Sequence, residues 1–265
     1  MTRLVEFCGP PGAGKSFWAA RFVESLATRL RLDACFEPAR PADLAGVRRL
    51  ARKAGAVTAG IAFAPALGRQ GLVHLFPGAQ ESSARRLMLT LNLLDRLGML
   101  TRQFRAEKIM VFDQGFAQLA AAGGLRDGAH LQLFLRELRD RGAVHEVVFV
   151  EVRAKSETRR QRLADRAEPA RRRRGPLGAC TRLGLRESNE ALVPHDRIAR
   201  VLDGLDRADK LTKVIAFDNG TELDGWGELP PALERLACKL AAMELEAGAG
   251  SGSLSEQRDD QSRTP

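Results

Sequence analysis

The chain has 265 residues, of which 44% are hydrophobic and 28% charged, a composition that is ordinary for one globular α/β domain. It excludes a fibrous protein and a wholly disordered chain. It also argues against a membrane-spanning helix, because charged residues interrupt the apolar runs before they reach the roughly 18 residues such a helix needs.

Apolar runs alternate with amphipathic stretches along the chain. The runs predict strands at 4–8, 34–36, 108–112, 146–152 and 212–217. Helical periodicity predicts helices at 15–30, 41–54, 80–104, 116–122, 129–141, 155–166, 187–205 and 231–245. In the third of these helices we expect Leu87, Leu91, Leu94 and Leu97 on one face and a break at Gly98. The stretch 56–76 fits a short strand or loops equally well. This order predicts a three-layer α/β/α sandwich with a mostly parallel sheet of about five strands.

The net charge of +9 raises the question of a polyanionic partner. Four of the charges lie in one run, Arg171 to Arg174, and a small anionic substrate explains that run as well as a polynucleotide does. Nucleic acid is therefore an alternative partner and not the favoured one. We expect no membrane partner, and the oligomeric state is left open.

The four cysteines lie far apart and have no spacing typical of a metal cage or a disulfide framework. We interpret them as reduced residues. No apolar leader precedes the glycine-rich motif near the amino end, so we expect a cytoplasmic protein.

The strongest signal follows the first predicted strand and opens the first predicted helix. It satisfies the pattern G-x-x-x-x-G-K-[ST] in full, as Gly9-Pro10-Pro11-Gly12-Ala13-Gly14-Lys15-Ser16. The glycines let successive backbone N–H groups point at one centre, which holds phosphate groups. Lys15 supplies a point charge for the terminal phosphates, and the hydroxyl of Ser16 is an oxygen ligand suited to Mg²⁺. We therefore predict ATP and Mg²⁺ as cofactors, with Phe17 completing the binding segment.

This motif, in this context, resembles the phosphate-binding loop of the P-loop NTPases, and the rest of the chain resembles their small-molecule kinase branch, which includes nucleoside, nucleotide and shikimate-type kinases. The resemblance implies a kinase-like domain over 1–246 with a lid at 155–184. Residues 247–265 are small, polar and low in complexity, so we expect a disordered tail there.

In that branch a strand beside the first one ends in an acidic residue, and Asp113 fits this position. A carboxylate at the carboxyl end of a buried strand faces the place where α/β folds bind ligands. It can orient the shell of Mg²⁺ or accept a proton from the attacking group. A turn residue or helix cap before Gly115 is the alternative explanation.

The predicted helix over 155–166 places Arg159, Arg162 and Arg166 on one face. It resembles the lid helix of these kinases, whose arginines clamp the transferring phosphoryl group. We take Arg162 and Arg166 as catalytic and Arg159 as a substrate contact. A solvated basic face explains the same spacing, and the run 171–174 fits either a lid edge or a solvated loop.

Two further positions come from the resemblance. Thymidylate-type kinases carry a Glu-Pro pair after the second strand, so Glu37, or nearby Asp33, is a candidate contact or base for the phosphoryl acceptor. An acidic residue at a helix start explains Glu37 equally well. Residues 217–220 match the place where such kinases pass the adenine base, although a turn made by Asn219 and Gly220 accounts for them too.

The leading hypothesis is an ATP-dependent kinase acting on a small polar acceptor. A regulatory ATPase or ATP-gated binding module, possibly associated with nucleic acid, is the alternative from another class, and a nucleotide-binding protein without turnover is the third. A GTPase is disfavoured, because Asp113-Gln114-Gly115 is one residue short of the D-x-x-G switch and no N-K-x-D occurs.

Overall fold

The computed structural model describes residues 2–32, 34–37, 46–63, 83–103, 109–125, 128–172, 195–206, 211–219 and 229–252. Its elements follow one another in the order β1 (Arg3–Cys8), α1 (Lys15–Thr28), β2 (Ala34–Glu37), α2 (Gly46–Phe63), α4 (Ser83–Gln103), β3 (Ile109–Asp113), α5 (Phe116–Ala122), α6 (Ala129–Asp140), β4 (Glu146–Arg153), α7 (Ser156–Arg172), α9 (His195–Asp206), β5 (Thr212–Asp218) and α10 (Pro231–Gly252).

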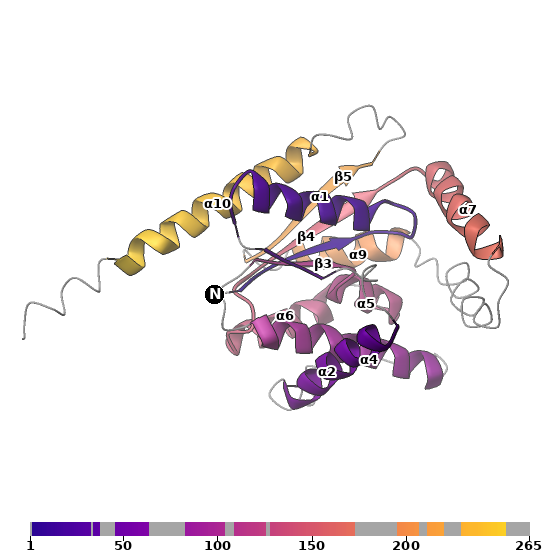
Figure 1. Cartoon of the computed structure of the whole chain (residues 1–265), viewed down its shortest axis with the longest axis horizontal. Coiled ribbons are helices and arrows are strands. Elements are labelled where there is room, and N and C mark those ends of the chain that lie inside the picture. The colour runs from indigo at the N-terminus through magenta and orange to yellow at the C-terminus, as the bar shows by residue number, and fades with distance from the viewer. Residues whose placement is uncertain are drawn as a thin grey trace, which may run out of the picture.

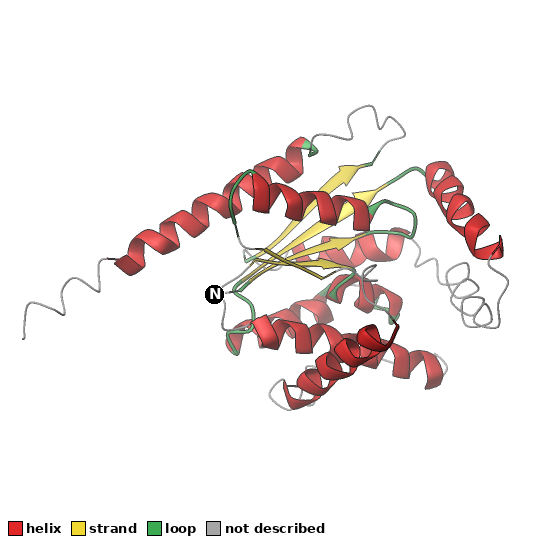
Figure 2. Cartoon of the chain, in the orientation of Figure 1, coloured by secondary structure: helices red, strands yellow, loops and turns green. Residues whose placement is uncertain are grey.

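The described strands form one parallel sheet in the order β2-β3-β1-β4-β5. Strand β1 lies at its centre, with Arg3 in register with Ile109 of β3 and Glu146 of β4. Each predicted strand is found to within one residue at either end. Helices cover both faces of the sheet (Figures 1 and 2), which confirms the predicted α/β fold.

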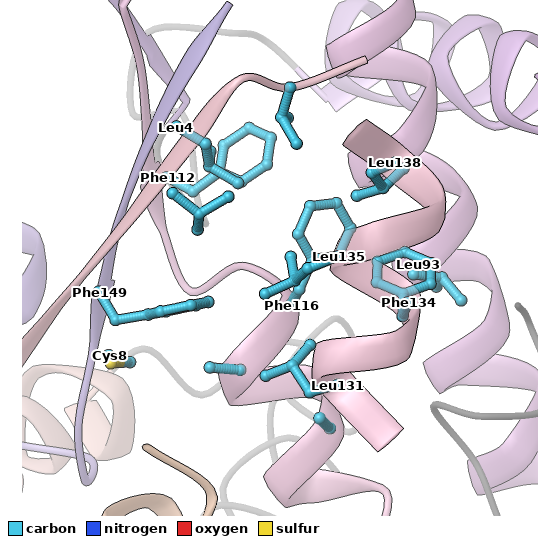
Figure 3. Packing of buried hydrophobic residues seen from close by; sticks show 14 of the residues in the cluster. Leu4, Cys8, Leu93, Phe112, Phe116, Leu131, Phe134, Leu135, Leu138 and Phe149 are labelled. Carbon is cyan, nitrogen blue, oxygen red and sulfur yellow. The ribbon is translucent and has the colours of Figure 1, made fainter. Parts of the chain in front are cut away.

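Alternate side chains of β1 enter two different cores. Val5 and Phe7 pack with residues of α1 and α10 on one face. Leu4 and Cys8 pack with α4, α5, α6 and α9 on the other, where Phe112, Phe116, Phe134 and Phe149 are all fully buried (Figure 3). Because both faces are covered, β1, β3 and β4 are buried almost throughout and most of their residues are apolar, as is typical of buried parallel strands.

The helices α2 and α4 correct two predictions. The helix predicted over 41–54 continues to Phe63, through the first part of the stretch that was ambiguous, and 41–45 and 64–76 lie outside the described residues. Gly98 does not break α4. A Cβ at Gly98 would lie 1.7 Å from the backbone oxygen of Ala56, and one at Gly60 would lie 2.0 Å from that of Leu94. The two glycines therefore bring the helix backbones into direct contact.

The buried face of α4 also differs from the predicted one. Leu87 is 59% exposed, and Leu91 and Leu94 are partly buried, whereas Leu97 lies in the core as predicted. The other leucines that reach the core are Leu89, Leu93 and Leu100. A run this rich in leucine fits more than one helical face, and the contact with α2 decides which one is buried.

Gly98→Ala is expected to lower the free energy of unfolding by about 1–3 kcal/mol, because a methyl group at this contact forces the two helices apart. Urea unfolding measures the change. The control is Ala54→Gly, an exposed position on α2, where only helix propensity is lost at a cost of about 1 kcal/mol. A Gly98→Ala protein as stable as its parent would contradict the backbone contact.

Two helices run beyond their predicted ends. α7 continues past residue 166 to Arg172, and α10 continues past 245 to Gly252, into the segment expected to be a disordered tail. Alanine, glutamate and arginine, which are strong helix formers, make up most of 167–172, whereas 246–252 contains three glycines, which are poor ones. Of the helix predicted over 187–205, residues 187–194 lie outside the description and α9 accounts for the rest. Within the described ranges, no helix has both the length and the hydrophobicity needed to cross a bilayer.

Candidate active site at the phosphate-binding loop

The loop between β1 and α1 has the backbone that its glycines predict. Gly12 has φ +81° and Gly14 has φ +95°, in the left-handed region that favours glycine. Neither has room for a side chain, since a Cβ would lie 2.9 Å from the backbone oxygen of Arg159 at Gly12 and 2.4 Å from the Nδ2 of Asn219 at Gly14. Gly14 is the N-cap of α1, so the positive end of that helix dipole lies at the loop.

Lys15 is buried within this loop, with 5% of its surface exposed. Its Nζ donates hydrogen bonds to the backbone oxygens of Gly9, at 2.8 Å, and Pro10, at 2.9 Å. These bonds hold the ammonium group inside the curve of the backbone. Ser16, the next residue, is exposed, and Phe17 is partly buried and packs edge-on against Trp18 with ring centroids 5.0 Å apart.

Asp113 ends β3 and is in register with Phe7, two residues before the loop begins. Only 1% of its surface is exposed, and its Oδ1 accepts no hydrogen bond from any residue that the structure describes. A buried polar atom without a partner loses the hydrogen bonds that water would give it, at a cost of roughly 1–3 kcal/mol. Asp113 therefore holds an oxygen ready for a ligand at the edge of the sheet where the loop lies.

The first half of α7 lies against the loop. The Nη1 of Arg162 is 3.4 Å from each of the backbone oxygens of Gly12 and Ala13. The backbone of Arg159 packs on Gly12, and its Nε is buried without a hydrogen-bond partner among the described residues. Figure 1 shows α7 beyond the carboxyl ends of the strands. Two of the three predicted lid arginines are thus brought to the loop.

The remaining predicted residues have side chains outside the described part of the chain. Arg166 belongs to α7 and Glu37 ends β2 in register with Phe112, but their side chains lie outside the described part of the chain. Asp33 lies outside it altogether, as does the segment 173–184 of the predicted lid.

Two side chains distant in sequence anchor the loop. The Nδ2 of Asn219, at the end of β5, donates to the backbone oxygen of Ala13 at 2.6 Å. The backbone N–H of Gly9 donates to the Oε1 of Gln118 on α5 at 3.3 Å. Sequence reasoning placed Asn219 near an adenine base or in a turn, whereas its side chain is buried and supports the loop. Gln118 gave no sequence signal.

Glu6, in the middle of β1, is the most unusual residue near the site. It is fully buried, and its carboxylate accepts hydrogen bonds from the backbone N–H groups of Ala117 and Gln118, at 3.2 and 3.1 Å, in the first turn of α5. Burial raises the pKa of Glu6 to about 7, although these hydrogen bonds oppose the shift. The sequence signal for it was a single charged residue inside an otherwise apolar strand.

A family model described as an AAA domain matches residues 4–180, from β1 through α7 and beyond. The chain belongs to this family of P-loop NTPases. No curated protein matches it. Membership of the AAA domain family identifies a nucleotide-binding P-loop protein and includes both kinases and other NTPases. The prediction of a P-loop protein is confirmed, and the reaction is a separate question.

The donors in this AAA domain fit Mg²⁺. The described residues contain no cluster of three or more metal-ligating side chains, so a cation with an all-protein cage is not indicated there. Mg²⁺ instead binds through one or two protein oxygens together with phosphates and water. The unpartnered Oδ1 of Asp113 and the exposed hydroxyl of Ser16 are such oxygens.

Proposed function

We propose that the protein is an ATP- and Mg²⁺-dependent phosphotransferase that moves the γ-phosphoryl group of ATP to a small acceptor. The observation that carries this proposal is the buried carboxylate of Asp113, which has an unpartnered oxygen beside the phosphate-binding loop. Such a group can accept the proton of an attacking hydroxyl or orient the metal shell, and phosphoryl transfer needs little other covalent chemistry from the protein.

The surroundings supply the rest of the mechanism. Lys15 and the amide-lined loop hold the triphosphate, with Asp113 and Ser16 as the protein ligands of Mg²⁺, which neutralises phosphate charge when it is bound. Arg159 and Arg162 approach the loop from the same chain, so charge that develops on the transferring group is stabilised without a partner subunit.

A regulatory or motor ATPase is the second candidate, and one feature disfavours it. Such ATPases usually carry a pair of acidic residues at the end of the strand beside the loop, one of which activates water. Here Asp113 is followed by Gln114, which is exposed and adopts a positive φ of 69°. A single carboxylate at this point fits transfer to a hydroxyl that the acceptor itself brings.

The test is ADP formation by the purified chain with Mg²⁺-ATP and a panel of nucleosides, nucleotides and sugars. We expect at least one small acceptor to stimulate turnover. Asp113→Asn should then lower kcat by roughly 100-fold, because it removes the anionic oxygen and keeps the shape. In a Trp226→Phe background the fluorescence of Trp18 measures ATP binding in the absence of Mg²⁺. Asp113→Asn should leave that binding unchanged.

Asp140→Asn, an exposed carboxylate at the end of α6, is the matched control and should leave turnover unchanged. If only DNA or RNA stimulates ATP hydrolysis, and the stimulation falls steeply with salt, the kinase proposal is wrong and the ATPase alternative is favoured. Full activity of Asp113→Asn would remove the role given to that carboxylate.

A further inference from the structure

Arg96 of α4 is a buried cation with weak partners. Only 8% of its surface is exposed, its guanidinium lies 5.3 Å from the ring centroid of Phe112, and its Nη1 is 3.7 Å from the sulfur of Met99. A thioether is a weak acceptor and a phenyl ring a modest partner for a cation. No carboxylate of the described residues lies within 4.0 Å of the Arg96 guanidinium. The carboxylates of Asp95, Glu6 and Asp113 act on its charge from further away. Within the described residues its N–H groups nonetheless find only weak acceptors, and polar groups buried in that way are costly.

A second arginine approaches the same sulfur from the neighbouring helix. The Nη2 of Arg52, on α2, is 3.9 Å from the Sδ of Met99, and Arg52 is partly buried. The two guanidinium groups thus lie near one small, neutral atom. Next to Arg52, the Nζ of Lys53 donates to the Oδ1 of Asn92 on α4 at 3.0 Å. Lys53 therefore adds a third cationic side chain to the α2–α4 contact, beside a residue seven positions before Met99 on α4.

The scaffold beneath these side chains is rigid. At Gly60 and Gly98 the backbones of α2 and α4 touch, so the helices cannot slide without separating. The Cα atoms of two arginines on such a pair keep a constant separation. The guanidinium fork is planar and matches a phosphate or carboxylate group with two parallel hydrogen bonds.

The location connects this cluster with the loop. Phe112, over which the guanidinium of Arg96 lies, directly precedes Asp113 in β3. Burial lowers the pKa of Arg96, and the charges of Asp95, Glu6 and Asp113 oppose that shift, so Asp113 is near enough to act on it. A ligand held by the arginines is thus close to the carboxylate proposed to serve the reaction.

We propose that Arg52 and Arg96 bind an anionic group of the phosphoryl acceptor, so that the acceptor is a phosphate monoester or a carboxylate and not a neutral nucleoside or sugar. The identification of this anion as part of the phosphoryl acceptor rests on the proposed kinase function. The existence of an anion site at Arg52 and Arg96 does not. The competing explanation is that Arg96 only offsets the buried carboxylates of Asp95, Glu6 and Asp113, which act on it through space.

The first experiment compares acceptors in matched pairs, measured as ADP formation: nucleoside monophosphates against nucleosides, sugar phosphates against sugars, and hydroxy acids against the corresponding alcohols. We expect only charged members to be accepted, and the pairs separate phosphate from carboxylate. Arg96→Met and Arg52→Met should each raise the KM for the acceptor at least tenfold, with the KM for ATP unchanged. Arg96→Lys should restore part of the affinity, because it keeps the charge but loses the fork.

Arg160→Met is the matched control, since Arg160 is exposed on α7, and it should change neither KM. A purely structural role for Arg96 predicts lower stability with an unaltered acceptor KM. Should Arg96→Met fail to fold, Arg52→Met, at a more exposed position, still decides the question. Neutral acceptors used at a rate that neither arginine variant affects would overturn the inference and leave the kinase proposal standing.

The second experiment needs no turnover. The phosphate-binding loop is saturated with Mg²⁺ and a non-hydrolysable imido analogue of ATP, and inorganic phosphate is titrated calorimetrically. We expect one phosphate site that weakens at least tenfold in Arg52→Met and Arg96→Met but not in Arg160→Met. If both arginine variants bind phosphate as the parent does, or if the parent binds no phosphate, the proposed anion site is wrong. An arginine-dependent site in a chain that phosphorylates nothing would keep the anion site and reject the kinase.

Discussion

Replacing Lys15 by alanine is expected to weaken binding of Mg²⁺-ATP by about 100-fold or more and to abolish most turnover, while the chain stays folded. The ammonium group of Lys15 is buried in the loop and bonded to the oxygens of Gly9 and Pro10 at 2.8 and 2.9 Å. Hydrogen bonds to charged groups contribute about 1.5–3 kcal/mol each, and a phosphate in this loop would lose its closest cation. Trp18 lies three residues further along α1, so its fluorescence reports the titration in a Trp226→Phe background.

Arg21→Ala is the control on the same helix. Arg21 is exposed to the extent of 34% and its Nη1 is 2.9 Å from the Oε2 of Glu24, a surface pair that contributes little. Nucleotide affinity should be unchanged in this variant. If Lys15→Ala bound ATP and transferred phosphate as its parent does, the loop would not be the nucleotide site and the proposed function would be wrong.

The elements of the fold that could be predicted are those whose signal is local. The strand at Glu146–Arg153 is a run of valines around a phenylalanine because both of its faces are buried, and that run is visible without any partner. The α2–α4 contact could not be predicted in the same way. Gly60 and Gly98 look like helix breakers in sequence, and only the partner backbone, about forty residues away, shows why glycine is needed.

The same distinction applies to the site. The loop from Gly9 to Ser16 is recognisable because its conformation and its lysine bonds arise within eight residues. Asn219 and Gln118 anchor this loop. Asn219 directly follows β5 and Gln118 lies near the start of α5, each more than a hundred residues from the loop in sequence. Arg96 could not be predicted as a site residue for a different reason. In a chain with this many arginines, a buried one carries no mark that distinguishes it from its exposed neighbours.

Glu6 leads to the second large effect, which concerns pH. Its folded-state pKa of about 7 lies above the ordinary value of 4.5. Between these values the folded chain keeps a proton on Glu6 that the unfolded chain has released, so the contribution of Glu6 to stability falls as pH rises through this window. The whole shift corresponds to about 3 kcal/mol, all of which is lost once the pH exceeds 7.

Glu6→Gln removes this titration. The free energy of unfolding of the variant, minus that of the parent, should rise by about 3 kcal/mol between pH 4 and pH 8, as measured by urea unfolding at several pH values. The amide has only one oxygen for the N–H groups of Ala117 and Gln118, so the variant starts from a lower stability at acidic pH. Only the change of this stability difference with pH tests whether burial raises the pKa of Glu6.

Glu24→Gln, at an exposed position on α1, gives the baseline, and its difference should stay within about 0.5 kcal/mol over the same range. A flat difference for Glu6→Gln would mean that the folded-state pKa of Glu6 lies near its ordinary value of 4.5, so that the carboxylate is ionised at neutral pH in the folded chain too. The hydrogen bonds from α5 would then balance burial. Since Gln118 also accepts the N–H of Gly9, that result would place a negative charge behind the phosphate-binding loop at neutral pH, where it would oppose nucleotide binding.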